Sequence, residues 1–197
     1  ETFTARYTHE TLALAFAITE EAIEDNLYDR LASRYTKALA RSMANTKQVK
    51  AANVLNNAFG TANGGDGKAL CADDHPIVAG TDRNELSTAA DLNETSLEQS
   101  LIDIAAMTDE RGLKIAAQGV KMIVPSALQF TAERLMKSSG RTATADNDIN
   151  AVVSKGMISQ GYVVNHYLTD TDAFFIKTDV PNGLKHFVRS PMKTAME

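Results

Sequence analysis

The pattern that most resembles a metal site in this chain is Asp170-Thr171-Asp172, two carboxylates that follow a predicted strand. His166 lies four residues before them. Clustered carboxylate oxygens bind hard divalent cations, so Asp170, Asp172 and His166 would be the ligands of a metal-dependent transferase. Two aspartates among threonines are also typical of a tight turn between strands. Because short motif matches are weak evidence, we favour the turn and keep the transferase as the alternative function.

A candidate phosphate-binding loop is the glycine-rich stretch that ends at Gly67-Lys68. A phosphate-binding loop requires Gly at position 62 and Ser or Thr at position 69, and both positions are Ala. We therefore interpret the stretch as a surface turn. Cys71 has no basic neighbour closer than Lys68 to lower its pKa, so we expect no nucleophile there. The histidines are scattered and none adjoins a catalytic constellation: His9, His75, His166 and His186.

Basic side chains form a stripe at helical spacing near the N-terminus. The stripe would face an acidic partner or packaged nucleic acid. The alternative is a solvent-exposed helix flank with local partners such as Glu21 and Asp25, and we favour this alternative because charge runs on helices are usually solvated. Contact with phosphates would be independent of nucleotide sequence. The residues are Arg30, Arg34, Lys37 and Arg41.

The element that positions this stripe is a helical run from Thr19 to Phe59, which contains no proline or glycine and stops at Gly60. At 1.5 Å per residue it would span roughly 60 Å, more than a compact domain of this size. Glu24 falls on the apolar side, which indicates a separate short element before Leu27. We expect the helix to be covered by other subunits. Its predicted apolar stripe comprises Leu27, Leu31, Tyr35, Ala38, Ser42, Thr46 and Val49.

An alternating segment precedes this helix. Residues 11–19 carry bulky Leu12, Leu14, Phe16 and Ile18 separated by alanines, a pattern that predicts a strand with one bulky face. Its exposed edge would invite pairing with another chain.

The rest of the chain predicts an α+β fold with a largely antiparallel sheet, because helices and strands do not alternate as βαβ units. Residues 60–93 form a long polar loop, and residues 140–150 are polar and expected to be exposed. A helix starts at the capping box Thr95–Glu98, with Leu97, Leu101, Ile104 and Ala105 as its buried face. Ser126 with Gln129 caps another helix over 126–137. Strands are predicted over 120–124, 162–168, 173–178 and 184–188.

Composition narrows the function. The 197 residues are 44% hydrophobic and 23% charged, which is ordinary for a globular protein, and the net charge of −5 argues against a basic nucleic-acid reader. The single cysteine excludes an intrachain disulfide. No apolar run reaches the roughly 20 residues of a membrane helix. The first residue is not Met, and we expect a chain truncated at both ends.

Several segments together resemble the major capsid protein of tailed bacteriophages, in particular the Mu-like major head subunit family. Residues 15–26 resemble its acidic entry to a long helix, and residues 53–59 with Gly65-Asp66-Gly67 resemble the helix exit. Residues 122–134 resemble its strand-Pro-helix unit. The other matching segments are 74–76, 90–98 and 187–191.

The resemblance implies the Johnson-type phage major-capsid fold. Residues 1–19 would form the extended-loop strand region, and residues 20–140 the peripheral domain with a spine helix at 27–59 and the loop at 60–93. Residues 141–197 would form an axial-domain-like strand region.

The resemblance further implies a structural subunit without catalytic activity or cofactor. It would self-assemble through pentamers and hexamers into an icosahedral shell around packaged double-stranded DNA. Scaffold, portal or decoration proteins would be further partners, without a membrane. The protein would reside in the virion after assembly in the host bacterial cytoplasm. Arg30, Arg34, Lys37 and Arg41 would serve as intersubunit or inward-facing contacts.

Overall fold

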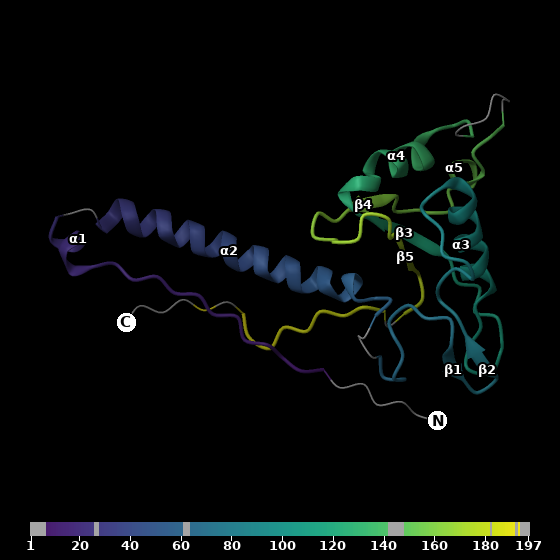
Figure 1. Ribbon diagram of the computed structural model, residues 1–197, viewed down its shortest axis with the longest axis horizontal. Helices are drawn as coiled ribbons and strands as arrows, with labels where there is room; N and C mark the ends of the chain where they lie inside the picture. The colour runs from purple at the N-terminus through teal and green to yellow at the C-terminus, as the bar shows by residue number, and fades with distance from the viewer. Residues whose placement is uncertain are drawn as a thin grey trace.

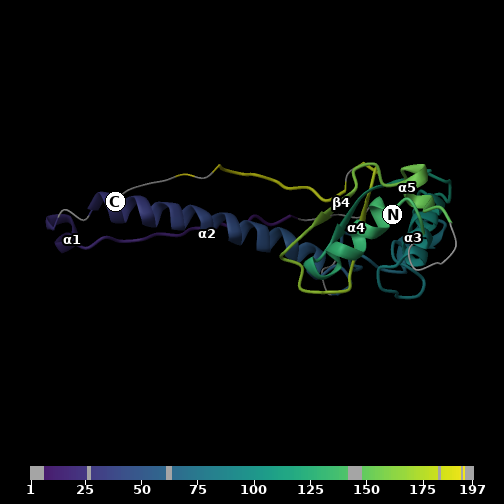
Figure 2. The ribbon, with the colours of Figure 1, turned by 90° about the horizontal axis from the view of Figure 1, so that it is seen from above.

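The computed structural model describes residues 7–25, 28–60, 64–141, 148–181, 183–191 and 193. One long helix extends away from a body that holds both small sheets (Figure 1), and the view from above shows the same separation (Figure 2). The body carries the buried core, whereas the helix is accompanied by extended segments from the two ends of the chain.

The predicted helical run is two helices, not one. Helix α1 spans Glu20–Glu24, and Thr19 caps it by accepting a hydrogen bond from the Ala22 N–H at 3.4 Å. Helix α2 spans Tyr28–Asn56, 29 residues, or about 43 Å at 1.5 Å per residue. The separate short element expected before Leu27 is therefore confirmed, and the unbroken helix to Phe59 is wrong.

Helix α2 ends three residues before Phe59 because asparagine side chains offer the backbone other partners. The Asn57 amide donates to the Asn53 carbonyl at 2.8 Å, which competes with continued helix. The Gly60 N–H then bonds the Asn57 carbonyl at 3.1 Å, which makes a turn into the body.

The main sheet has the order β4-β3-β5. Strand β3 (Gly119–Val124) lies in the middle, parallel to β4 (Tyr162–Val164) and antiparallel to β5 (Phe175–Thr178). The largely antiparallel sheet that we expected is thus wrong for β4, which is also shorter than the predicted 162–168. The chain between β3 and β4 contains helices, and a crossover of this length returns it parallel to its start.

The helices between β3 and β4 do not begin as the sequence predicted. The Ser126–Gln129 capping box is absent: a 3-10 turn η1 (Ser126–Leu128) precedes α4 (Gln129–Lys137), and neither helix has a side-chain cap. Helix α5 (Ala151–Lys155) follows, capped by Asn150. Asn150 was expected to be exposed but is 2% exposed, because its amide donates to the Leu135 carbonyl at 2.8 Å. Residues 142–147 of that predicted polar stretch lie outside the described residues.

Helix α3 (Glu94–Ala106) packs on the sheet through Leu97, Leu101 and Ile104 of the predicted face, whereas Ala105, the fourth predicted member, is exposed. It begins one residue before Thr95, because Asn93 and Ser96, not Thr95 and Glu98, form the capping box. The core joins this helix to the sheet and the crossover helices. Its buried members are Leu92, Leu97, Leu101, Met122, Val124, Ala132, Leu135, Val152 and Ile158.

The long loop holds a small hairpin of β1 (His75–Ile77) and β2 (Gly80–Asp82), paired antiparallel. Two further predicted strands are not formed in the described chain. Residues 7–19 and 184–188 are extended but pair with no strand among the described residues. Both segments run in the same direction along α2 (Figure 1). They meet where the Tyr7 and Phe187 rings lie 5.1 Å apart.

Candidate interaction surfaces

The N-terminal arm, residues 7–19, lies along one face of α2 (Figures 1 and 2). The Phe16 and Tyr35 rings are 5.7 Å apart near one end of the arm, and Lys50 Nζ lies 2.8 Å from Glu10 Oε2 near the other. Between these contacts, half-buried Leu39, Met43 and Thr46 recur at helical spacing. These five helix positions make up the arm-facing side of α2.

The predicted apolar stripe is therefore only partly correct. Leu31 and Thr46 are half-buried, and Tyr35, although exposed, contacts Phe16 of the arm. Ala38, Ser42 and Val49 are exposed, and Leu27 lies outside the described residues. The arm itself keeps much of its bulky face in solvent: Leu12 is 37% exposed, Leu14 46% and Phe16 41%. An apolar surface of this kind is typical of a contact with another chain.

The basic face of α2 consists of Arg30, Arg34, Lys37 and Arg41. The Arg30 side chain lies outside the described part of the structure, whereas the other three are exposed. At 100° per residue they project from the side roughly opposite the arm. Within the described residues these three form no salt bridge, and Glu21 and Asp25, the alternative local partners, form none either.

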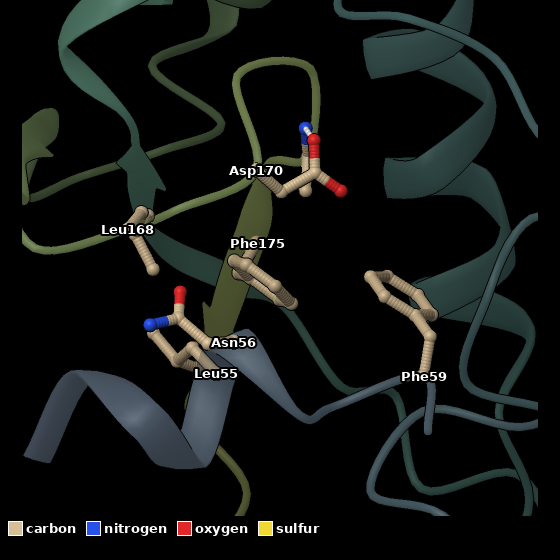
Figure 3. A pocket seen from close by; sticks show the side chains of 7 residues that line it. Leu55, Asn56, Phe59, Leu168, Asp170 and Phe175 are labelled. Atoms are coloured by element: carbon tan, nitrogen blue, oxygen red, sulfur yellow. Dashed lines mark hydrogen bonds between the residues drawn. The ribbon is translucent and has the colours of Figure 1, made fainter. Parts of the chain in front are cut away.

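The C-terminal end of α2 is fixed to the body by Asn56. Its amide donates to the Tyr167 carbonyl at 3.1 Å, and its side-chain oxygen accepts from the Thr169 N–H at 3.0 Å. The Phe59 and Phe175 rings stack with centroids 5.7 Å apart, side by side in Figure 3. These contacts set the direction in which α2 leaves the body.

The small pocket beside this joint has a volume of about 10 Å³, room for roughly one water molecule. Figure 3 shows that it lies between the end of α2 and the loop that leads to β5. It is lined by Leu55, Asn56, Phe59, Leu168, Asp170, Ala173 and Phe175.

The candidate metal ligands are used in local structure. Asp170 Oδ1 accepts hydrogen bonds from the N–H groups of Asp172 at 2.9 Å and Ala173 at 3.3 Å, as expected of a turn. His166 Nδ1 instead lies 3.0 Å from Ser126 Oγ. In the part of the chain that the structure describes, no group of three His, Cys, Asp or Glu side chains is arranged to hold a metal ion. The transferase alternative therefore gains no support.

Sequence reasoning missed three side-chain pairs. Ser126 and His166 are 40 residues apart, and only the parallel pairing of β3 with β4 brings them together. In the long loop, His75 Nδ1 lies 2.6 Å from Asp66 Oδ2, and Lys68 forms a salt bridge with Asp74. The sequence signal for the two loop pairs was the close spacing of two acidic and two basic side chains, Asp66, Lys68, Asp74 and His75, in a glycine-rich loop.

The hydrogen bond with His75 lowers the pKa of Asp66, with help from the Lys68 backbone N–H and against the opposing effect of partial burial. Burial raises the pKa of Cys71 to about 11, with a smaller contribution from Glu85. A thiol with this pKa stays protonated at neutral pH, in agreement with the expectation that Cys71 is not a nucleophile.

A long helix with an attached arm, both with exposed apolar or charged faces, is the kind of surface through which structural subunits contact other chains. The chain belongs to the phage capsid protein family, whose model matches residues 2–197. It is therefore a structural protein of a bacteriophage virion. No curated protein and no solved structure matches the chain at a significant level. None of the helices in the described ranges combines the length and apolar character needed to cross a bilayer.

Proposed function

We propose that this chain is the major capsid subunit of a tailed bacteriophage, of the Mu-like branch and the Johnson-type fold. It self-assembles into an icosahedral shell that encloses packaged double-stranded DNA. The observation that carries the proposal is the pairing of α2 with the arm: about 43 Å of helix protrudes from the body with only one side covered. Family membership supports the capsid role.

The proposed division follows the chain. Residues 1–19 form the extended-loop region, residues 20–140 the peripheral domain with α2 as its spine, and residues 141–197 the axial-domain-like region. Strand β3 belongs to the second region and β4 with β5 to the third, so the sheet joins the two.

The basic face of α2 is the proposed contact surface, with Arg30, Arg34, Lys37 and Arg41 directed at a neighbouring subunit or at the shell interior. Shells depend on many weak, repeated contacts related by symmetry. The subunits would form pentamers and hexamers in the host cytoplasm, with scaffold, portal or decoration proteins as further partners and packaged DNA nearby.

The test is to express the whole gene product with its neighbouring head genes and to analyse the lysate by sedimentation and electron microscopy. We expect angular particles of uniform diameter that sediment far ahead of the subunit. A protein that stays monodisperse and small across salt and scaffold conditions would contradict the proposal.

A further inference from the structure

The N-terminal end of α2 carries two exposed patches of opposite charge. The acidic tip, residues 20–25, comprises α1 and the residue after it, and Glu20, Glu21, Glu24 and Asp25 are all exposed there. The basic face of α2 carries exposed Arg34, Lys37 and Arg41, together with Arg30 by spacing. The acidic tip therefore carries four negative charges, and the basic face carries four positive charges. No salt bridge among the described side chains involves either patch.

The tip does not cover the basic face of its own chain. Helix α1 lies beyond the N-terminal end of α2 in both views (Figures 1 and 2). Arg34 and Arg41 lie about 9 and 20 Å along α2 from its first residue, by the rise per residue. The face therefore runs away from the tip and presents its far end to solvent.

We propose that the basic face of α2 binds the acidic tip of a second copy of this chain. This inference rests on the proposed function and names the partner of its contact surface. One contact satisfies both patches, whereas DNA would neutralise the basic face and leave the acidic tip unpaired. The net charge of −5 also disfavours DNA as the partner of the whole subunit.

Exposed apolar side chains lie next to the charges in both the acidic tip and the basic face. Ile23 is 52% exposed within the acidic tip, and Ala38 is exposed beside the basic face. An apolar centre with a charged rim is the usual composition of a protein interface. Because the two patches differ, the contact is head-to-tail, which generates rings when the rotation closes.

Reciprocal charge reversal in the full-length protein tests the proposal. Arg34→Glu, Lys37→Glu and Arg41→Glu together, or Glu20→Lys, Glu21→Lys and Glu24→Lys together, are each expected to reduce particle yield by about tenfold or more, because attraction becomes repulsion. The six substitutions combined are expected to restore most of the yield. A mixture of the two three-residue variants is expected to co-assemble into rings with an even number of subunits, in which the variants alternate, since each supplies the charge that the other lacks.

The matched control reverses three exposed lysines outside both patches, Lys47→Glu, Lys114→Glu and Lys155→Glu, and is expected to assemble as wild type. Circular dichroism of the unassembled subunits separates misfolding from lost contact. Should the combined variant and the mixture both fail to assemble while the subunits stay folded, the pairing is wrong.

Two other results would also overturn the pairing and leave the proposed shell intact. In one, every variant forms normal particles. In the other, the basic-face variant forms normal particles that hold less DNA, which would identify DNA as the partner. Failure of the wild-type chain to assemble under all conditions would instead contradict the proposed function itself.

Discussion

The side chain of Asn56 accepts a hydrogen bond at 3.0 Å from the backbone of Thr169, a residue 113 positions away. Together with the bond from the Asn56 amide to the Tyr167 carbonyl, it ties the last residue of α2 to the loop before β5. A long helix attached to a body at one end acts as a lever, so this joint controls where the arm and the basic face are held.

Replacing Asn56 with alanine removes both bonds and leaves two loop backbone groups without their partner. We expect a loss of about 1–3 kcal/mol in the free energy of unfolding, measured by urea denaturation of the unassembled subunit. Asn45→Ala, at an exposed position of α2, is the control and should be neutral or slightly stabilising. Equal effects of the two substitutions would show that the joint adds no stability.

The contact between Phe16 and Tyr35 is expected to hold the arm on α2. A double-mutant cycle of Phe16→Ala and Tyr35→Ala should give a coupling free energy of about 0.5–1.5 kcal/mol, as for other tilted aromatic pairs. Hydrogen exchange of residues 7–19 should accelerate in either variant. Additive effects and unchanged exchange would mean that the arm is held by other contacts.

The ionisation of the Asp66 carboxyl group is expected to make the stability of the protein depend on pH. Its lowered pKa means that the folded state favours the ionised form, so the stabilisation is complete above pH 3.8, the ordinary value, and is lost as the pH falls through the lowered pKa. We expect wild type to exceed Asp66→Asn in stability above pH 3.8, with the difference disappearing in stronger acid. The measurement is the urea midpoint of both proteins between pH 2 and 6.

Asp73→Asn is the matched control for this titration, since Asp73 is exposed in the same loop. This substitution removes a carboxyl group from the loop without breaking the bond between Asp66 and His75. A difference between wild type and Asp66→Asn that stays constant over this pH range would contradict the role of that bond.

Gly119 begins the central strand where a side chain has no room. A β-carbon there would lie 2.8 Å from Leu101 Cδ2 and 3.0 Å from Ile176 Cγ2. Gly119→Ala is therefore expected to cost about 1–3 kcal/mol in the free energy of unfolding, because the packed side chains of Leu101 and Ile176 must shift to make room. Gly183→Ala, where nothing lies within 4 Å, should be nearly neutral in the same denaturation experiment. Equal stability of the two variants would show that this packing is loose.

The sequence predicted what depends on local periodicity. The face of Leu97, Leu101 and Ile104 and the strand at 120–124 both follow from side-chain spacing, and the structure confirms them. The direction of β4 did not follow, because alternation in Tyr162–Val164 describes which side chains share a face and not which strand lies beside them.

The two terminal segments show that side-chain alternation alone does not establish a strand. Leu12, Leu14 and Phe16 alternate as in a strand, but they pair with no strand among the described residues. Arg34, Lys37 and Arg41 share one exposed face of α2, and the position of this face opposite the arm depends on which side of α2 the arm covers. Ser126 and His166 required the fold to bring them together.

The most direct test of the central claim is an electron cryo-microscopy reconstruction of particles assembled from the full-length protein. We predict a closed icosahedral shell in which each repeating unit contains one rod of density about 43 Å long, the length of α2. Particles without icosahedral symmetry, or repeating units that lack this rod, would contradict the assignment of the chain as the shell-forming subunit.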